Sequence, residues 1–464
     1  MNPSLQKITL VVALLTSFMG PFLISSVNIA LPDIQRAFQA DAVLLSWIAT
    51  AYLLSMAATL VPAGKIADRW GRVRLFAVGL AVLVVATLAS AGAPSIRALI
   101  VTRVFQGMGA ALVVTTGMPI LIAVYPPQER GRTIGLYVAA VYLGLSAGPL
   151  VGGLLTQYGT WRLIFVALAP LNLLALFLTL RYLPRETPQA EPAAFDVAGT
   201  VLYAVSLILI VYGASRLPAL FAWGLIACGA LGLIGFVFWE LRIPWPVFEV
   251  RFFAGNRVFA FSSLAALINY SGTFVVTFLM SLYLQYIKGF SPQSAGLVLV
   301  AQPIVQAAFS PLAGRLSDRI EPAVLASLGM TLTACGLAFL ATLSQATPLG
   351  LILGVLVVLG LGFALFSSPN MNAIMGSIDQ RHYGIASGVV ATMRLLGQMT
   401  SMAIATLVFA VVIGPSEIVP ALYPRFLASA RICFSISAGL CFVGIFFSIY
   451  RGRLRPTGER ESPP

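Results

Sequence analysis

Long apolar runs recur along the chain and are separated by short polar segments. About 20 apolar residues span the hydrocarbon of a bilayer as a helix, because only a helix satisfies its own backbone polar groups there. The pattern predicts an all-α integral membrane protein with fourteen transmembrane helices. The predicted helices begin near Ile8, Val43, Leu75, Ala98, Thr133, Leu163, Val197, Ala219, Val258, Gln293, Val324, Leu351, Ile385 and Phe426.

Composition and charge agree with a membrane protein. Hydrophobic residues make up 59% of the chain and charged residues 9%, which is far from the soluble average. The net charge of +13 by itself suggests a nucleic-acid partner. However, if the amino terminus is cytoplasmic, most Lys and Arg residues fall in cytoplasmic segments, which is the positive-inside pattern. We therefore predict a multi-pass protein of the cell (cytoplasmic, inner) membrane, with both termini in the cytoplasm. We expect it to contact the lipid bilayer, to bind no nucleic acid and to be a monomer.

Nothing in the sequence indicates catalysis. The four cysteines all fall within apolar segments, so neither a disulfide framework nor a metal site is indicated. No lysine lies in a nucleotide-binding P-loop. The string from Gly144 to Gly148 spells G-x-S-x-G, but it lies within a membrane helix, and the only histidine, His382, is in a distant loop. We predict no enzyme activity, no cofactor and no metal.

Two strings recur in the second half of the chain, which indicates an internal duplication. The string GKIADRWGR after the second apolar stretch returns as GRLSDRIEP after the tenth, and GMGAAL returns as GLGFAL. A displacement of eight helices implies two six-helix bundles with two helices inserted between them, a transporter architecture. The predicted parts are an N-terminal bundle (1–183), a linker with the inserted helices (184–256), a C-terminal bundle (257–450) and a basic tail (451–464).

The loop GKIADRWGRVRL, after the second stretch, resembles the signature G-x-L-A-D-R-x-G-R of the major facilitator superfamily. The resemblance covers essentially the whole chain. It implies two bundles that rock about a central cavity, with a charge cluster in the loops that gates the alternation. The implied cluster consists of Gly64, Asp68, Arg69, Gly71, Arg72, Gly314, Asp318 and Arg319.

Further motifs resemble the fourteen-helix drug:proton antiporter branch of that superfamily. They are FDVAGTVL at the seventh helix, GIASGVVATMRLLGQ in the thirteenth, and the glycine pattern of the fifth. In antiporters the glycine pattern lies where the halves meet and implies export; as a bare pattern it indicates a helix-packing face. Here it consists of Gly135, Gly144, Gly148, Pro149, Gly152 and Gly153.

Arg103, in the fourth stretch, matches the family string R-x-x-Q-G-x-G-A-A. An arginine at membrane depth needs a partner or a watery cavity. Two interpretations stay open: a role in proton or conformational coupling, and a structural arginine bound to backbone carbonyls.

The branch usually carries an acid in its first helix, in a pattern like L-D-x-T-x-x-N-x-A-L-P. Here Leu23 occupies the position of that acid, and the nearest carboxylate, Asp33, comes only after Pro32. The charges expected within the membrane are then Arg103 and Arg394, and both are positive. A cavity of that sign attracts anionic or zwitterionic amphiphiles. Asp33, Arg103 and Arg394 are the candidates for coupling.

Polar and aromatic side chains near the middle of the apolar stretches are candidates for the substrate cavity. They are Phe18, Phe22, Ser25, Asn28, Tyr52, Asn269, Tyr270, Gln302, Gln306, Asn370 and Asn372. The main hypothesis is export of amphipathic small molecules or drugs by alternating access with proton antiport. One alternative is a proton-independent uniporter or exchanger of organic anions or zwitterions. The other is a membrane scaffold or sensor that transports nothing.

Overall fold

The computed structural model describes residues 3–184, 195–379 and 383–452. These residues contain 14 helical spans that are long and apolar enough to cross a membrane, and they contain no strand. The all-helical, fourteen-span prediction is therefore confirmed. The predictions for His382 and for most of the tail concern residues outside the described ranges.

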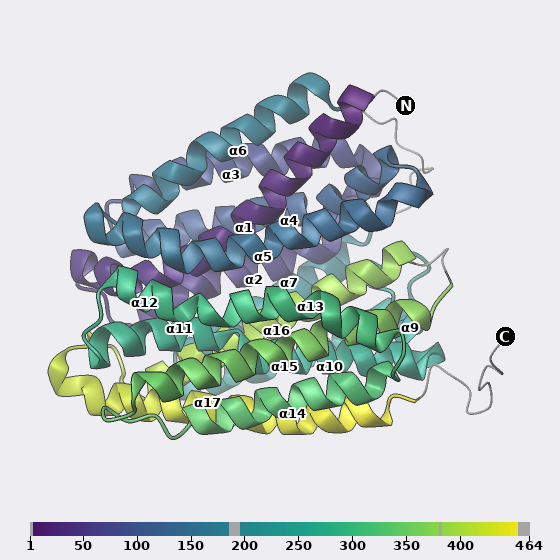
Figure 1. Ribbon diagram of the computed structural model, residues 1–464. Coiled ribbons are helices and arrows are strands. Elements are labelled where there is room, and N and C mark those ends of the chain that lie inside the picture. The colour runs from purple at the N-terminus through teal and green to yellow at the C-terminus, as the bar shows by residue number, and fades with distance from the viewer. Residues whose placement is uncertain (1–2, 185–194, 380–382, 453–464) are drawn as a thin grey trace.

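The first six spans form one bundle, in the upper part of Figure 1. Within it α1 packs on α5, α2 on α4, and α3 on both α4 and α6. The helices are α1 (Pro3–Phe38), α2 (Ala42–Trp70), α3 (Arg72–Ala91), α4 (Ile96–Val124), α5 (Pro127–Tyr158) and α6 (Arg162–Tyr182).

The last six spans form the second bundle, in the lower part of Figure 1. Here α10 packs on α16 and α17, and α15 packs on α13 and α14. The elements are α10 (Arg257–Thr273), α11 (Val275–Leu282), the π-helix η1 (Tyr283–Ile287), α12 (Pro292–Leu299), α13 (Ala301–Ser317), α14 (Pro322–Leu340), α15 (Leu349–Gly376), α16 (Tyr383–Val412), the short η3 (Pro420–Leu422) and α17 (Tyr423–Tyr450).

Two spans of the second bundle are interrupted for identifiable reasons. The ninth changes from α10 to α11 at Phe274, where the backbone N–H of Val275 donates to the Ser401 hydroxyl over 3.0 Å instead of continuing the helical ladder. The tenth span changes from α12 to α13 at Val300. Pro303, three residues later, has no backbone N–H and therefore cannot donate the regular helical hydrogen bond.

The two bundles repeat one helix crossing, which supports the internal duplication. In the first, a Cβ placed on Gly79 of α3 would lie 2.9 Å from the carbonyl oxygen of Gly109 on α4. In the second, a Cβ on Gly362 of α15 would lie 2.8 Å from the carbonyl oxygen of Gly329 on α14. Only glycine lets backbones approach this closely, so the equivalent crossings need glycine on both helices.

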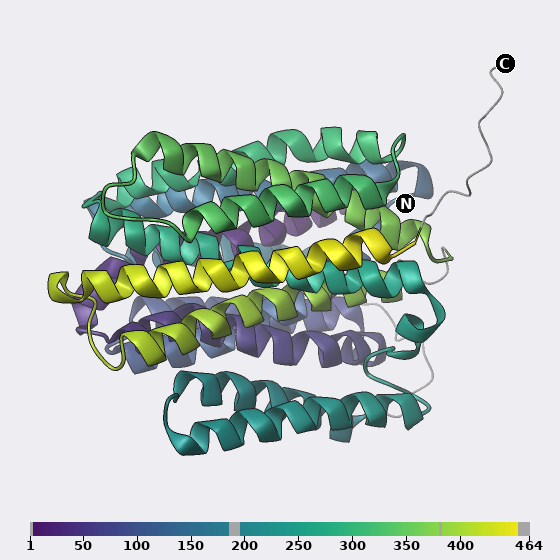
Figure 2. The ribbon, with the colours of Figure 1, turned by 90° about the horizontal axis from the view of Figure 1, so that it is seen from below.

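The inserted pair, α7 (Val197–Ser215) and α8 (Leu220–Arg242), forms a hairpin on the outside of the two bundles. Figure 2 shows this hairpin in teal, set apart from the other helices. It contacts the rest of the protein through α7, which packs on α2 and α16. A linker segment, residues 243–250, and the short helix α9 (Arg251–Gly255) lead from α8 into the second bundle.

Candidate functional site

The two bundles meet along a seam. The end of the molecule that carries the start of α1, the α2–α3 turn and the end of α17 is called the terminal end here, and the opposite end the far end (Figure 1). At the far end α1 is bonded to the ninth span. The hydroxyl of Ser281 donates to the carbonyl oxygen of Asn28 over 2.7 Å, and the amide of Gln285 donates to that of Ile29 over 2.9 Å. The hydroxyl of Tyr286 donates to Gln35.

A second set of seam bonds joins α2 to α16. The hydroxyl of Thr406 lies 3.0 Å from that of Ser46 and 3.1 Å from that of Thr50, so one threonine connects two turns of α2. Closer to the far end, the N–H of Ala42 donates to the carbonyl oxygen of Ser416 over 3.0 Å. These bonds and those of α1 close the far end on both sides of the seam.

The glycine face of α5 completes the far-end closure. A Cβ on Gly153 would lie 2.6 Å from the carbonyl oxygen of Pro292, and Gly296 of α12 approaches the backbone of Pro149 just as closely. Gly144, Gly148 and Gly152 on the same helix admit the backbone and small side chains of α1. Gly135, toward the terminal end, has nothing within 4 Å of a Cβ position. Helix α5 is therefore tightly packed at the far end, and it has open space at Gly135 nearer the terminal end.

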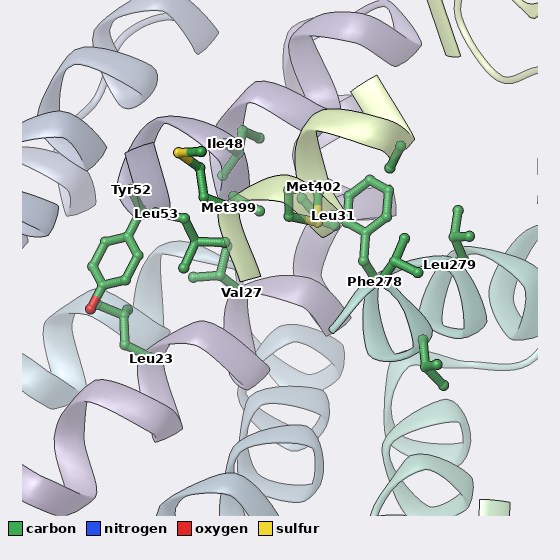
Figure 3. Close-up of a cluster of buried hydrophobic side chains, with 14 of the residues drawn as sticks. Leu23, Val27, Leu31, Ile48, Tyr52, Leu53, Phe278, Leu279, Met399 and Met402 are labelled. Carbon is green, nitrogen blue, oxygen red and sulfur yellow. The ribbon is translucent and has the colours of Figure 1, made fainter. Parts of the chain in front are cut away.

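An apolar cluster fills the seam between these polar contacts. Figure 3 shows its side chains, which come from helices of both bundles. Leu23 points toward the Tyr52 ring in this cluster (Figure 3) and is 4% exposed. The position that carries an acid in the antiporter branch is thus filled by a packed leucine. The labelled members are Leu23, Val27 and Leu31 of α1, Ile48, Tyr52 and Leu53 of α2, Phe278 and Leu279 of α11, and Met399 and Met402 of α16.

Arg103 is fully engaged within the first bundle. It is 1% exposed, and its Nε donates to the carbonyl oxygen of Ile48 over 3.1 Å. Its Nη1 donates to the amide oxygen of Gln106 over 2.9 Å, and Gln106 in turn donates to Thr87 over 3.1 Å. The guanidinium carbon also lies 4.3 Å from the centre of the Tyr52 ring, a cation–π distance. These contacts are those expected of a structural arginine.

Arg394 faces the opposite bundle. It lies on α16, is half-buried, and is close enough to Tyr270 of α10 to interact with its hydroxyl electrostatically. Tyr137, on α5 of the first bundle, is close enough to interact electrostatically with Arg394, and Tyr142 of α5 interacts in the same way with Tyr270. These four residues are called the tyrosine–arginine site below. It brings one cation and three phenol rings together from both sides of the seam.

Two further residues support Tyr270. Its ring packs edge-on against Phe363 with the centroids 5.3 Å apart, and its hydroxyl lies near Ser367. Sequence reasoning selected Tyr270 and Arg394 but missed Tyr137 and Tyr142. The available signal was their position in the fifth stretch, between Gly135 and Gly144, where α5 faces the seam.

The remaining cavity candidates near the far end are packed. Phe18 and Phe22 stack on each other with centroids 5.4 Å apart, beside Gly144. The Ser25 hydroxyl donates to the carbonyl oxygen of Pro21 over 2.8 Å, and Asn28 is buried at the seam. Asn269 is fully buried, and neither amide atom has a hydrogen-bond partner in the described chain. The structure therefore places these side chains in contacts between helices.

The other candidates lie along α13 and α15. Gln306 is buried, while Gln302 approaches Gly360 through its carbonyl oxygen. Asn372 donates to the Ser317 hydroxyl. Asn370 donates to the carbonyl oxygen of Ser262 over 3.0 Å and accepts from Arg451 over 3.0 Å. Burial at this terminal-end contact lowers the pKa of Arg451 to about 10, and the nearby charge of Glu321 acts in the opposite direction.

The predicted gating cluster lies at the terminal end. Gly71 alone forms the α2–α3 turn, and its φ of 93° is a backbone conformation that favours glycine. The Arg72 guanidinium lies 3.5 Å from the Asp68 carboxylate in a half-exposed ion pair, beside Gly64 and Arg69. Such an exposed pair contributes about 1 kcal/mol at most. In the repeat, Gly314 lies within α13 and Asp318 and Arg319 directly follow it.

Asp33, the carboxylate proposed for coupling, lies at the far end. It forms an ion pair with Arg36, and its second oxygen is buried without a hydrogen-bond donor. The neighbouring Tyr286–Gln35 bond places Asp33 beside the closed seam. In the described ranges, no group of three or more His, Cys, Asp or Glu side chains is arranged to hold a metal ion.

The sequence matches a known protein family over most of its length. A model of the Major Facilitator Superfamily matches residues 13–250 and 262–464. The chain belongs to this superfamily. Its members are transporters and not enzymes, so the prediction of a transporter is confirmed, and family membership replaces the scaffold alternative.

Several relatives match most of this chain. The riboflavin transporter RibZ of Clostridioides difficile is 29% identical over 96% of this chain and 97% of its own. The multidrug resistance protein Stp of Mycobacterium tuberculosis is 31% identical over 86% of this chain and 75% of its own. The tetracenomycin C resistance and export protein of Streptomyces glaucescens is 31% identical over 84% of this chain and 73% of its own. The resemblance to drug-efflux members of the superfamily is thus confirmed.

Among solved structures, a bacterial homolog of the human lysosomal transporter Spinster shares the fold of this superfamily member. The TM-score is 0.69 over 97% of each chain, at 18% identity. At that identity the likeness concerns the fold alone. The protein is therefore a multi-pass membrane transporter of small molecules with the major facilitator architecture.

Proposed function

We propose that this transporter exports amphipathic small molecules from the cell by alternating access, coupled to proton antiport. The observation that carries the proposal is the tyrosine–arginine site, because it joins the two bundles along a seam whose far end is closed. A substrate bound there contacts both bundles, so binding and rocking are linked. Transport and drug-resistance functions in the names of RibZ, Stp and the tetracenomycin protein support export.

The direction of transport follows from the placement of basic residues. They gather at the terminal end, which is then cytoplasmic under the positive-inside rule, in the cell membrane. The far end, with its closed seam, faces outward. In this arrangement the tyrosine–arginine site is reached from the cytoplasm, as an exporter requires before it loads its substrate. Because the path lies within one chain, the proposed working unit is a monomer.

The substrate class follows from the chemistry of the tyrosine–arginine site. Phenol rings stack on flat apolar groups and donate hydrogen bonds at their edges. The Arg394 guanidinium attracts a carboxylate, a carbonyl or another electron-rich group. We therefore propose planar amphiphiles that are anionic, zwitterionic or rich in carbonyls as substrates.

Proton coupling is assigned to Asp33, because the usual first-helix acid is replaced by Leu23. Asp33 lies beside the seam that must open for release, and one of its oxygens lacks a donor. Asp33 would take up a proton from the outside when the far end opens, and this step would couple the proton gradient to the rocking of the two bundles. Arg103, already bonded to two acceptors, would contribute by holding α2 and α4 together.

A second candidate function is proton-independent exchange of organic anions or zwitterions. The packed Leu23 favours it, because this position then provides no charge that could take up a proton.

Proteoliposomes with a pH-sensitive dye inside separate the two functions. Cationic and anionic amphiphiles are added under an imposed proton gradient, and both the dye and the substrate are followed. Substrate-dependent loss of the gradient that disappears in Asp33→Asn supports antiport through Asp33. Substrate movement with no proton flux supports exchange, and no substrate movement at all contradicts both.

A further inference from the structure

Two carboxyl groups meet at the terminal end of the inserted hairpin. Asp196 immediately precedes α7 and is 6% exposed, while Glu240 lies in the last turn of α8 and is 0% exposed. A Cβ on Gly199 would lie 2.9 Å from Oε1 of Glu240 and would also collide with Oδ2 of Asp196. The two oxygens therefore flank the same small space, and the two carboxyl groups interact directly.

Three of the four carboxyl oxygens accept hydrogen bonds from nitrogen donors. For Asp196, Oδ1 accepts from the N–H of Gly199 over 2.9 Å, and Oδ2 accepts from the indole N–H of Trp239 over 3.0 Å. For Glu240, Oε2 accepts from the N–H of Phe248 over 3.0 Å. The fourth oxygen, Oε1 of Glu240, is buried and has no donor.

Among the residues that the structure describes, no cation is paired with either carboxyl group. Lys65, on the neighbouring helix α2, lies 3.9 Å from Glu249, and Arg251 donates to the carbonyl oxygen of Leu241 over 3.0 Å. Arg394, on α16, interacts with the tyrosines of its own site. The nearby cations are thus engaged elsewhere.

We propose that Asp196 and Glu240 form a proton-binding site that holds one proton between their carboxyl groups. Ionised carboxylates only accept hydrogen bonds, so two that face each other away from water repel unless one is protonated. One proton gives the orphan Oε1 its hydrogen bond and halves the buried charge. A metal ion fits poorly, because it needs several oxygen ligands and three of these oxygens already face N–H donors.

Occupancy of this proton site acts on the linker segment 243–250. Glu240 holds the linker through the N–H of Phe248, and the Phe248 ring packs on Phe253, with ring centroids 5.9 Å apart. The next residue, Glu249, reaches Lys65 of the first bundle. Loss of the proton leaves two adjacent buried charges, which push α7 and the end of α8 apart and loosen this connection between the bundles. The site would thus make the terminal-end connection sensitive to pH.

This inference does not rest on proton antiport, because the site lies outside the tyrosine–arginine site and its proton is detected without substrate. The test is infrared spectroscopy of the purified full-length protein in lipid nanodiscs at neutral pH. Wild type is expected to show the carbonyl band of a protonated carboxylic acid. Asp196→Asn and Glu240→Gln should each abolish the band, since an amide donates to the remaining carboxylate in place of the proton. The exposed Glu129→Gln is the matched control and should keep it.

A wild-type spectrum without this band at neutral pH overturns the proposal, whatever the variants do. So does a band that persists in either Asp196→Asn or Glu240→Gln, and so does its removal by added sodium at constant pH. Thermal unfolding gives a second measurement. The folded pair holds a proton that the unfolded chain releases, so wild-type stability should fall as pH rises above about 4.3, the pKa of a glutamate in the unfolded chain, and level off once the folded pair has lost its proton. Glu240→Gln should flatten this dependence, and an unchanged slope counts against the site.

Discussion

Arg103 and Arg394 look alike in the sequence, since each is a lone arginine in an apolar run, yet the structure gives them different surroundings. Arg103 is buried in its own bundle, with Ile48 and Gln106 as acceptors and Tyr52 beneath its guanidinium. Arg394 is half-buried at the seam, where its neighbours include Tyr137 from the opposite bundle. The hydrogen bonds of Arg103 lie within one bundle and stabilise it. Arg394 can change its neighbours when the bundles move.

The contrast shows that an intramembrane charge is informative about function only once its partners are known. A membrane-buried arginine must be compensated. Compensation inside one rigid bundle stabilises that bundle. Compensation across a moving seam changes with the conformation, and a substrate can contribute to it.

The largest expected effect is on stability, from Arg103→Ala. This change removes the second donor of the Ile48 carbonyl oxygen and leaves the amide oxygen of Gln106 buried without one, so it should lower the free energy of unfolding by about 2–4 kcal/mol. Denaturant titration of the protein in mixed micelles measures it. Arg97→Ala, at an exposed position of the same helix, should cost about 0.5 kcal/mol or less. Equal losses for the two variants would contradict the structural assignment.

The second-largest effect is expected from Arg394→Gln, which should impair transport and leave stability unchanged. Losing the guanidinium removes the charged contact with the substrate, so transport of anionic amphiphiles in proteoliposomes should fall about tenfold, or 1.4 kcal/mol. Its unfolding midpoint should match that of wild type. Arg394→Lys keeps the charge and should retain part of the activity. A strongly destabilised Arg394→Gln protein would contradict the view that Arg103 acts in stability and Arg394 in transport.

A smaller effect is expected from Tyr142→Phe, which keeps the ring and removes only the hydroxyl of the tyrosine–arginine site. Losing one hydrogen-bonding group should reduce apparent substrate affinity about threefold to tenfold. Binding is measured by tryptophan quenching or by calorimetry. Tyr182→Phe, at the exposed end of α6, is the control. If both variants bind substrate as wild type does, Tyr142 lies outside the substrate path.

The smallest effect should come from Thr406→Val, which removes the contacts of α16 with Ser46 and Thr50. Interhelical hydrogen bonds in membranes contribute about 0.6 kcal/mol on average. The equilibrium should shift toward opening of the far end by about that amount, or roughly threefold. Spin-label distances between α2 and α16 at the far end detect the shift. Thr342→Val, in an exposed loop at the same end, should leave the distances unchanged.

Much of the architecture was predictable because hydropathy alone reports membrane spans. The fourteen spans follow from apolar run lengths, the inserted pair from the displacement of the recurring strings by eight helices, and the α5 packing face from glycine spacing. The tyrosine–arginine site was only half predictable. Tyr270 and Arg394 stood out as polar groups in apolar runs, but Tyr137 and Tyr142 did not, because aromatic residues in membrane helices mostly pack or face lipid.

Proximity between residues far apart in the sequence was not predictable. The acid pair illustrates this, since Asp196 precedes the first inserted helix and Glu240 lies at the end of the second. They meet because α7 and α8 are antiparallel and Gly199 leaves room for both carboxyl groups. Conversely, Ser25 and Asn28 looked like cavity residues, and the structure instead packs them against α5 and α11.

The sequence by itself determined that this chain crosses a bilayer fourteen times, belongs with the major facilitators and lacks the usual acid at Leu23. These properties depend on local composition and on short motifs, which each segment carries alone. The tertiary structure decided which arginine faces the seam, which end is closed and which carboxyl groups share a space. Those properties depend on how helices distant in sequence pack, and an apolar helix in lipid can present any of its faces until its neighbours fix one.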